Sequence, residues 1–128
     1  MLQTIALFGE AEKGAFKTPH VFNRLPQLFD HLGNPPMESD GLCFAVQAIL
    51  YQREVIYFRV EEEGFSKNDY AHGLKALENK TKKVHALCLP GVGDPGILAL
   101  TAAVCHIHNS ILITNQKDLY DFLTSMPT

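Results

Sequence analysis

The chain has little of several features that would assign a protein to a class at once. Its 128 residues hold three cysteines, eleven basic side chains against fourteen acidic ones, and no long uninterrupted hydrophobic run. The net charge of -3 lacks the basic excess on which non-specific nucleic-acid binding depends, so nucleic acid is not a favoured partner. The longest apolar stretch, around residues 97–105, is too short to span a bilayer, and no membrane association is expected.

The few cysteines do not stand in the paired spacing of a metal site or of a disulfide framework. Cys43, Cys88 and Cys105 each sit inside an apolar run, which predicts buried, reduced thiols. An alternative for Cys88 is a nucleophile activated by a nearby helix N-terminus. Because residues 1–5 carry no basic leader, we expect a cytoplasmic protein.

The overall composition is that of an ordinary globular protein. Hydrophobic residues make up 46% of the chain and charged residues 20%. A chain of this length can bury one core without disulfides or metals, so residues 1–128 are predicted to form a single α/β domain.

Four short apolar runs predict strands that are covered on both faces, at residues 4–8, 55–60, 84–89 and 110–114. Helical patterns follow the last three runs. The first of these helices is capped by Ser66, the second is capped by Asp94 and extends to about His108, and the third includes Leu119 and Met126. This alternation predicts a Rossmann-like three-layer α/β sandwich with about four mainly parallel strands and helices on both faces.

The link from residue 9 to residue 54 is less regular. A short helix is expected over residues 25–32, closed by Gly33, and a stronger one from Ser39 or Asp40 through Tyr51. No strand is predicted in this link.

Two of the predicted helical segments, residues 42–51 and 97–105, are apolar almost all round. A helix without a polar face must be covered on most sides, and one small domain cannot easily enclose two of them. We therefore expect a homo-oligomer, most simply a twofold dimer in which one of these helices meets its copy. The alternative is that small residues such as Ala102 and Ala103 lie exposed without consequence.

A small-molecule ligand is expected at the carboxyl ends of the strands, where ligands bind in open parallel sheets. Residues 91–96 match the pattern G-x-G-x-x-G between a strand and a helix, where glycines let the backbone approach a phosphate. The alternative for this segment is a tight turn with a good helix cap. The predicted ligand-binding residues are Gly9, Glu10, Lys13, Gly91, Gly93, Asp94 and Asn115.

A divalent metal is a second hypothesis for the same edge of the sheet. Carboxylates that converge at strand ends supply the oxygen ligands that Mg²⁺ and Mn²⁺ prefer. The predicted ligands are Glu10, Glu61 and Asp94, and Glu63 and Asp118 are further acids for a metal-dependent reaction. The alternative is that these acids only offset the dipoles of the helices that begin at this edge.

The function remains open among three hypotheses. The first is a small-ligand binding or regulatory protein, with a nucleotide or phosphate as the ligand class. The second is a metal-dependent hydrolase or nuclease, and the third is a protein-interaction module without a catalytic site. The sequence assigns no cofactor, and it does not decide whether the protein is an enzyme.

Overall fold

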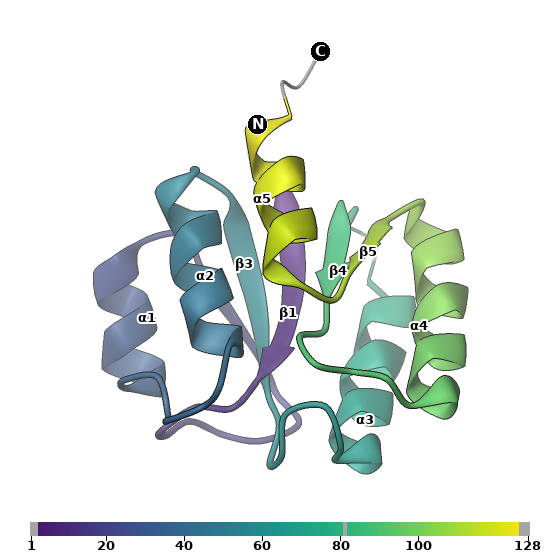
Figure 1. The fold of residues 1–128 in the computed structure, drawn as a ribbon, viewed down its shortest axis with the longest axis horizontal. Coiled ribbons are helices and arrows are strands. Elements are labelled where there is room, and N and C mark those ends of the chain that lie inside the picture. Colours follow the sequence, from purple (N-terminus) through teal and green to yellow (C-terminus); the bar gives the residue numbers. More distant parts are fainter. Residues whose placement is uncertain (1–2, 81, 126–128) are drawn as a thin grey trace.

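One five-stranded sheet runs through the middle of the molecule (Figure 1). The computed structural model describes residues 3–80 and 82–125. In the order β2-β3-β1-β4-β5, β2 is antiparallel to β3 and the other four strands are parallel. The strands are β1 (Thr4–Gly9), β2 (Pro19–Phe22), β3 (Glu54–Arg59), β4 (Ala86–Cys88) and β5 (Ile111–Ile113). The predicted Rossmann-like α/β sandwich is confirmed.

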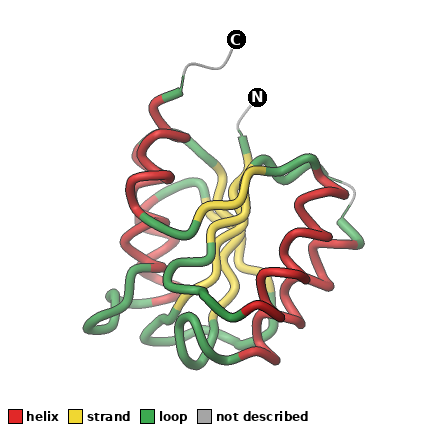
Figure 2. The backbone as a smooth tube through the Cα atoms, turned by 45° about the vertical axis from the view of Figure 1, so that its right-hand side comes forward, coloured by secondary structure: helices red, strands yellow, loops and turns green. Residues whose placement is uncertain are grey.

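Helices form a layer on each face of this sheet, as Figure 2 shows with the strands between them. The helices are α1 (Leu25–Leu32), α2 (Gly41–Leu50), α3 (Lys67–Glu78), α4 (Pro95–His108) and α5 (Gln116–Thr124). The buried side chains of α1, α2 and α5 share one hydrophobic cluster, and those of α3 and α4 share the other. The sheet therefore separates two cores.

Strand β1 lies at the centre of the sheet and supplies both cores. Ile5 and Leu7 point into the cluster with α2, whereas Ala6 and Phe8 point into the cluster with α3. All six residues of the strand are buried. A strand covered on both faces reads as a continuous apolar run, which explains why this element was visible in the sequence.

Strand β2 was not predicted from the sequence. It lies at one edge of the sheet, and only Phe22 of its four residues is buried. It begins at Pro19, which has no N–H to donate to a ladder and so suits the first position of an edge strand. A short edge strand of this kind lacks the apolar pattern on which strand prediction depends.

The helices begin where they were predicted to begin, but the predicted capping side chain is not always the one that caps the helix. Asp94 caps α4, because its carboxylate accepts a hydrogen bond from the backbone N–H of Ile97 at 2.9 Å. Asn115 likewise caps α5 by accepting from the N–H of Asp118 at 2.8 Å. The capping role predicted for Ser66 is wrong, because its hydroxyl instead bonds the backbone of Glu62.

The three cysteines are all free, but they differ in exposure. Cys88 is buried and Cys105 is half-buried, as expected of packed thiols. Cys43 is exposed, so the prediction of a buried thiol is wrong there. It lies on the one side of α2 that faces solvent, although the helix is apolar almost all round. None of the helices in the described part of the chain has the length and hydrophobicity needed to cross a membrane.

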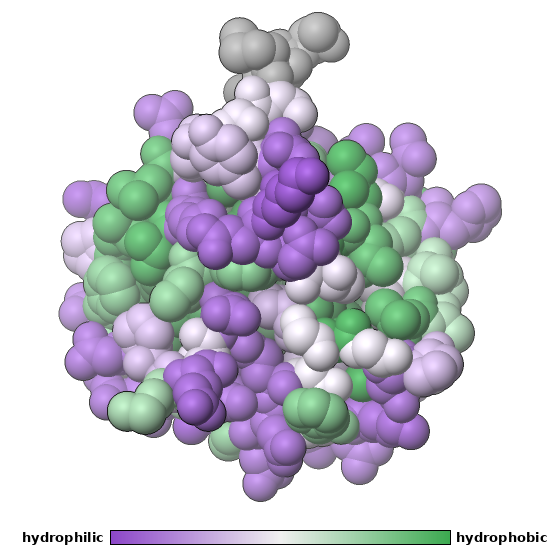
Figure 3. Space-filling view, viewed as in Figure 1, coloured by the Kyte–Doolittle hydropathy of each residue, from purple (hydrophilic) through white to green (hydrophobic). Residues whose placement is uncertain are grey.

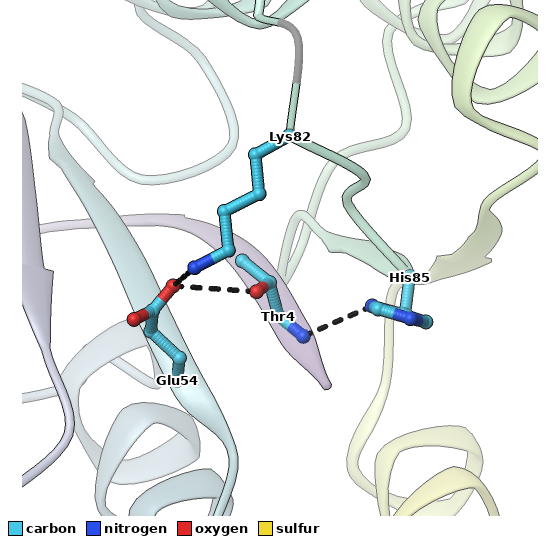
Figure 4. A network of polar contacts seen from close by, with 4 residues as sticks. All are labelled: Thr4, Glu54, Lys82 and His85. Atoms are coloured by element: carbon cyan, nitrogen blue, oxygen red, sulfur yellow. Dashed lines mark hydrogen bonds and ion pairs between the residues drawn. The ribbon is translucent and has the colours of Figure 1, made fainter. Parts of the chain in front are cut away.

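The amino ends of the three central strands are tied together by polar side chains (Figure 4). The backbone N–H of Thr4 donates to Nδ1 of His85 at 3.0 Å. The hydroxyl of Thr4 donates to the Glu54 carboxylate at 3.3 Å, and Lys82 forms an ion pair with the same carboxylate. Burial and the nearby Lys83 lower the pKa of His85, which favours the neutral ring that can accept from Thr4.

Candidate functional site

The residues predicted to bind a ligand lie along the carboxyl edge of the sheet. Gly9 ends β1, and the loop of Gly91 follows β4, which pairs with β1. The N–H of Gly91 faces the carbonyl of Thr114 at 3.5 Å, which places Asn115 beside that loop. The three loops are therefore neighbours, as expected for consecutive positions in a parallel sheet. The structure describes their arrangement and leaves ligand binding as a prediction.

Glu63, one of the acids considered for a metal-dependent reaction, organises this edge. Its carboxylate accepts hydrogen bonds from the backbone N–H groups of Asp40 at 2.7 Å, Gly41 at 3.1 Å and Glu10 at 3.0 Å. Two of these donors belong to the start of α2, for which Asp40 supplies no side-chain cap. Glu63 thus caps a helix that begins 22 residues before it in the chain.

Burial raises the pKa of the Glu63 carboxyl above its ordinary value. The three backbone donors act in the opposite direction, because they stabilise the charged form, but burial is the larger effect. A half-buried carboxylate with three backbone partners has little capacity left for a ligand. Its contacts explain its position without any bound group.

Close backbone packing holds this arrangement together. A Cβ atom built on Gly9 would lie 2.6 Å from the Cα of Gly41. The two backbone segments therefore approach each other more closely than a side chain at Gly9 would allow. The hydroxyl of Tyr57 donates to the carbonyl of Glu10 at 2.8 Å beside them. Burial raises the pKa of Tyr57 well above its ordinary value, so this hydroxyl keeps the proton that it donates. The close backbone packing therefore explains why position 9 is a glycine, without any bound ligand.

The G-x-G-x-x-G segment forms the start of α4. Asp94 Oδ2 accepts from Ile97, and Oδ1 lies 3.3 Å from the Lys67 ammonium. These contacts hold the pKa of Asp94 below its usual range, with the Ile97 N–H as the largest cause. Pro95 supplies no N–H. The chain's own carboxylate therefore occupies the position at this helix start where a phosphate would bind.

Two of the three predicted metal ligands bind separate backbone N–H groups, and the third is exposed. Glu10 accepts from the N–H of Glu63 at 2.9 Å, Asp94 caps α4, and Glu61 has an exposed side chain. Among residues 3–80 and 82–125, no three His, Cys, Asp or Glu side chains are grouped so as to hold a metal ion. Asp94 acts at a helix start and Glu10 binds the N–H of a neighbouring loop, and a metal site at this edge stays a prediction.

Lys13 and Cys88, the other two candidates near this edge, also have structural surroundings. The side chain of Lys13 is exposed, and its N–H bonds the carbonyl of Leu32 at 3.2 Å. Burial raises the pKa of the Cys88 thiol well above its ordinary value. A thiol that keeps its proton is a poor nucleophile, so the reactive alternative for Cys88 has no support.

The other feature with functional potential is the free side of β5, which sequence reasoning did not single out. We call the strand Ile111–Ile113 with its open side the β5 edge. β5 is the last strand of the sheet, and Ile111 and Leu112 are 55% and 36% exposed. An open groove of about 480 Å³ lies beside it, with Ile111, Leu112 and Phe122 as its apolar lining and Asp118 and Asp121 at its polar side.

The stretch of chain that forms α4 and β5 contains no formally charged side chain, so the acids beside the β5 edge come from α5. From Pro95 to Gln116 the sequence contains no Asp, Glu, Lys or Arg, although charged residues make up 20% of the whole chain. In Figure 3 apolar surface lies directly beside the hydrophilic side chains of α5, where Figure 1 places β5 and α4. The exposed Leu100 and Ile107 of α4 belong to the same uncharged stretch.

The two sites thus differ in what they offer a partner. The carboxyl edge presents acids that already serve the chain's own backbone, whereas the β5 edge presents apolar side chains and an open strand. No family model, curated protein or solved structure matches this chain.

Proposed function

We propose that this chain acts as a protein-interaction module that binds a partner through the β5 edge. The observation that carries the proposal is the uncovered end of the sheet at Ile111 and Leu112, on a strand that has no charged side chain. This was the third of the functions considered from the sequence. The proposed function requires neither a catalysed reaction nor a cofactor.

An exposed edge strand offers backbone donors and acceptors to any extended segment that can reach it. Proteins that must not pair in this way protect such edges with charged side chains, proline or bulges. β5 and its flanking residues, Ser110 and Thr114, include none of these side chains. Exposed Ile and Leu side chains add apolar area that becomes buried when a partner binds.

The opposite edge of the sheet provides a contrast within the same molecule. β2 begins with Pro19, which has no N–H to offer an added strand, whereas β5 contains no proline, although with three residues it is the shorter strand. His31 of the adjacent α1 lies against Phe22, with ring centroids 5.6 Å apart. This edge therefore has two of the protections that β5 lacks, which favours β5 as the binding edge.

The ligand-binding and metal hypotheses have weaker support. Glu10, Glu63 and Asp94 already accept hydrogen bonds from backbone N–H groups. A ligand or a metal ion would have to compete with these contacts. Both hypotheses stay predictions.

A photo-crosslinking amino acid placed at position 112 tests the proposal in the cells that make the protein. We expect a defined crosslinked protein, identified by mass spectrometry, which then binds the purified chain in solution. The matched control has the crosslinker at Leu50, which is 64% exposed at the end of α2, a helix that packs on β1 and β3. The proposal fails if position 112 yields no protein that position 50 does not also yield.

Two variants that each introduce a positive charge add a second measurement. Leu112→Lys should abolish binding of the identified protein, because it places a charge in an apolar contact. Leu50→Lys should leave the binding unchanged. Equal binding by both variants would show that the contact lies elsewhere.

A further inference from the structure

We infer that the partner of the β5 edge is a second copy of this chain, with the two β5 strands paired antiparallel about a twofold axis at Leu112. This inference rests on the proposed function and specifies its partner. It converts two five-stranded sheets into one continuous sheet.

The backbone of β5 has the hydrogen-bonding pattern that this pairing requires. The N–H of Ile111 donates to the His85 carbonyl at 3.1 Å, and the Ile113 carbonyl accepts from Leu89 at 2.8 Å. Since peptide groups alternate in direction along a strand, those of Leu112 point away from β4. In an antiparallel pair, a residue whose N–H and C=O both face its own copy can exchange two hydrogen bonds with it.

The side chains of β5 suit the same register. With Leu112 opposite its copy, Ile111 lies opposite Ile113 of the second chain on the same face of the sheet. Ile113 is buried, whereas Ile111 is more than half exposed. The pairing would therefore cover the exposed isoleucine with an apolar neighbour and extend the core that Ile113 already joins.

The position of α4 also fits two copies side by side. α4 packs on β4 and β5, and strands in a sheet are about 4.8 Å apart. A twofold axis just outside β5 would place the two α4 helices about 10 Å apart, close to the 8–10 Å of packed helices.

The side of α4 that would face its copy is apolar and has a small residue at its centre. Leu100 and Ala103 line a groove beside α3. Leu98, Ala102 and Cys105 lie at i, i+4 and i+7 on the other flank of the helix. Ala102 is exposed between its two half-buried neighbours, so it permits close approach of a second helix.

The absence of charge favours a second copy over a different protein. In a twofold interface each surface meets itself, so a charge near the axis would face a like charge. A partner of another kind could be matched by opposite charges. The stretch from Pro95 to Gln116 offers no Asp, Glu, Lys or Arg for such matching, and β5 and α4 bring none against their own copies. The acids beside the strand, Asp118 and Asp121, belong to α5 and line the polar side of the groove.

Sedimentation equilibrium of the purified full chain over a range of concentrations tests the inference. We expect a monomer–dimer equilibrium whose dissociation constant rises roughly 100-fold or more in Leu112→Lys, because an unpaired charge must be buried. Ile111→Lys, at the more exposed neighbouring position, should have the same effect, and Leu50→Lys should have none. Circular dichroism checks that each variant is folded.

A disulfide experiment tests the register. In a Cys43→Ser, Cys105→Ser background, Leu112→Cys should form a crosslinked dimer on mild oxidation, whereas Leu50→Cys should not. A chain that sediments as a monomer at all concentrations, or a dimer that survives Leu112→Lys, overturns the inference. If the purified chain is monomeric while the crosslinker at position 112 captures a different protein, the inference fails and the proposed function stands.

Discussion

Glu10 and Glu63 each accept a hydrogen bond from the other's backbone: the N–H of Glu10 donates to the Glu63 carboxylate at 3.0 Å, and the N–H of Glu63 donates to the Glu10 carboxylate at 2.9 Å. The two residues belong to loops that follow neighbouring strands. Their reciprocal contact fixes the distance between these loops. Acids that look like a metal site in the sequence thus act as acceptors for the chain's own amides.

Replacing Glu63 should therefore destabilise the fold. Glu63→Ala removes the acceptor of three backbone N–H groups and leaves α2 without its cap. We expect a loss of about 2–3 kcal/mol in the free energy of unfolding, measured with urea. The matched control is Glu62→Ala, whose exposed side chain should change the value by less than about 0.5 kcal/mol. Equal effects would refute the capping role.

The close approach at Gly9 predicts that alanine is much less well tolerated at Gly9 than at Gly93. In Gly9→Ala the new Cβ would lie 2.6 Å from the backbone of Gly41, so we expect a loss of roughly 1–3 kcal/mol. In Gly93→Ala nothing lies within 4 Å of the new Cβ, and the stability should change little. Thermal unfolding of the two variants gives the comparison. A tolerant Gly9 would mean that the two loops are not packed as described.

The lowered pKa of His85 predicts a loss of stability in mild acid. The unfolded chain binds a proton near pH 6.5, whereas the folded chain binds it only at lower pH. The contribution of His85 is therefore complete above about pH 6.5 and declines as the pH falls below it.

Urea midpoints measured from pH 7.5 down to pH 5 should show this decline in the wild type. The decline should be smaller in His85→Gln, which cannot titrate. NMR titration of the His85 ring should give a pKa below that of an exposed histidine. A value above 6.5 would contradict the hydrogen bond from Thr4.

Divalent metal ions should not stabilise the protein. Glu10 and Asp94 would have to give up their contacts with backbone N–H groups in order to bind Mg²⁺ or Mn²⁺. We expect no rise in the melting temperature at millimolar Mg²⁺, with or without nucleotides. A rise that disappears in both Asp94→Asn and Glu61→Gln would restore the metal hypothesis. Asp94→Asn alone is ambiguous, because the loss of a cap costs about 1 kcal/mol at most sites.

Much of the fold could be predicted because the buried strands and the helix starts leave local signals. The apolar run of β1 and the Asp94-Pro95 pair each describe their own surroundings, and both predictions agree with the structure. β2 left no such signal, since it has a single buried residue and starts at a proline. The error at Cys43 has a related cause, because an apolar helix does not show which of its sides faces solvent.

The site was harder to predict because its contacts join distant parts of the chain. Nothing near residue 41 indicates that Glu63 caps α2, and only the strand order brings them together. The exposure of the β5 edge likewise depends on the strand order and not on local sequence. The run at residues 110–114 predicts a strand, but whether that strand lies inside the sheet or at its free end depends on pairing that one sequence does not reveal.

The central place of β1 has a consequence for how the chain is made. Thr4 pairs with Glu54, and Ile5 pairs with Ala86, so the strand needs partners that are synthesised much later. During translation its apolar residues leave the ribosome well before either neighbour exists. Contacts between such distant residues slow folding, and the emerging chain must keep this segment from aggregating until residue 86 is free to join it.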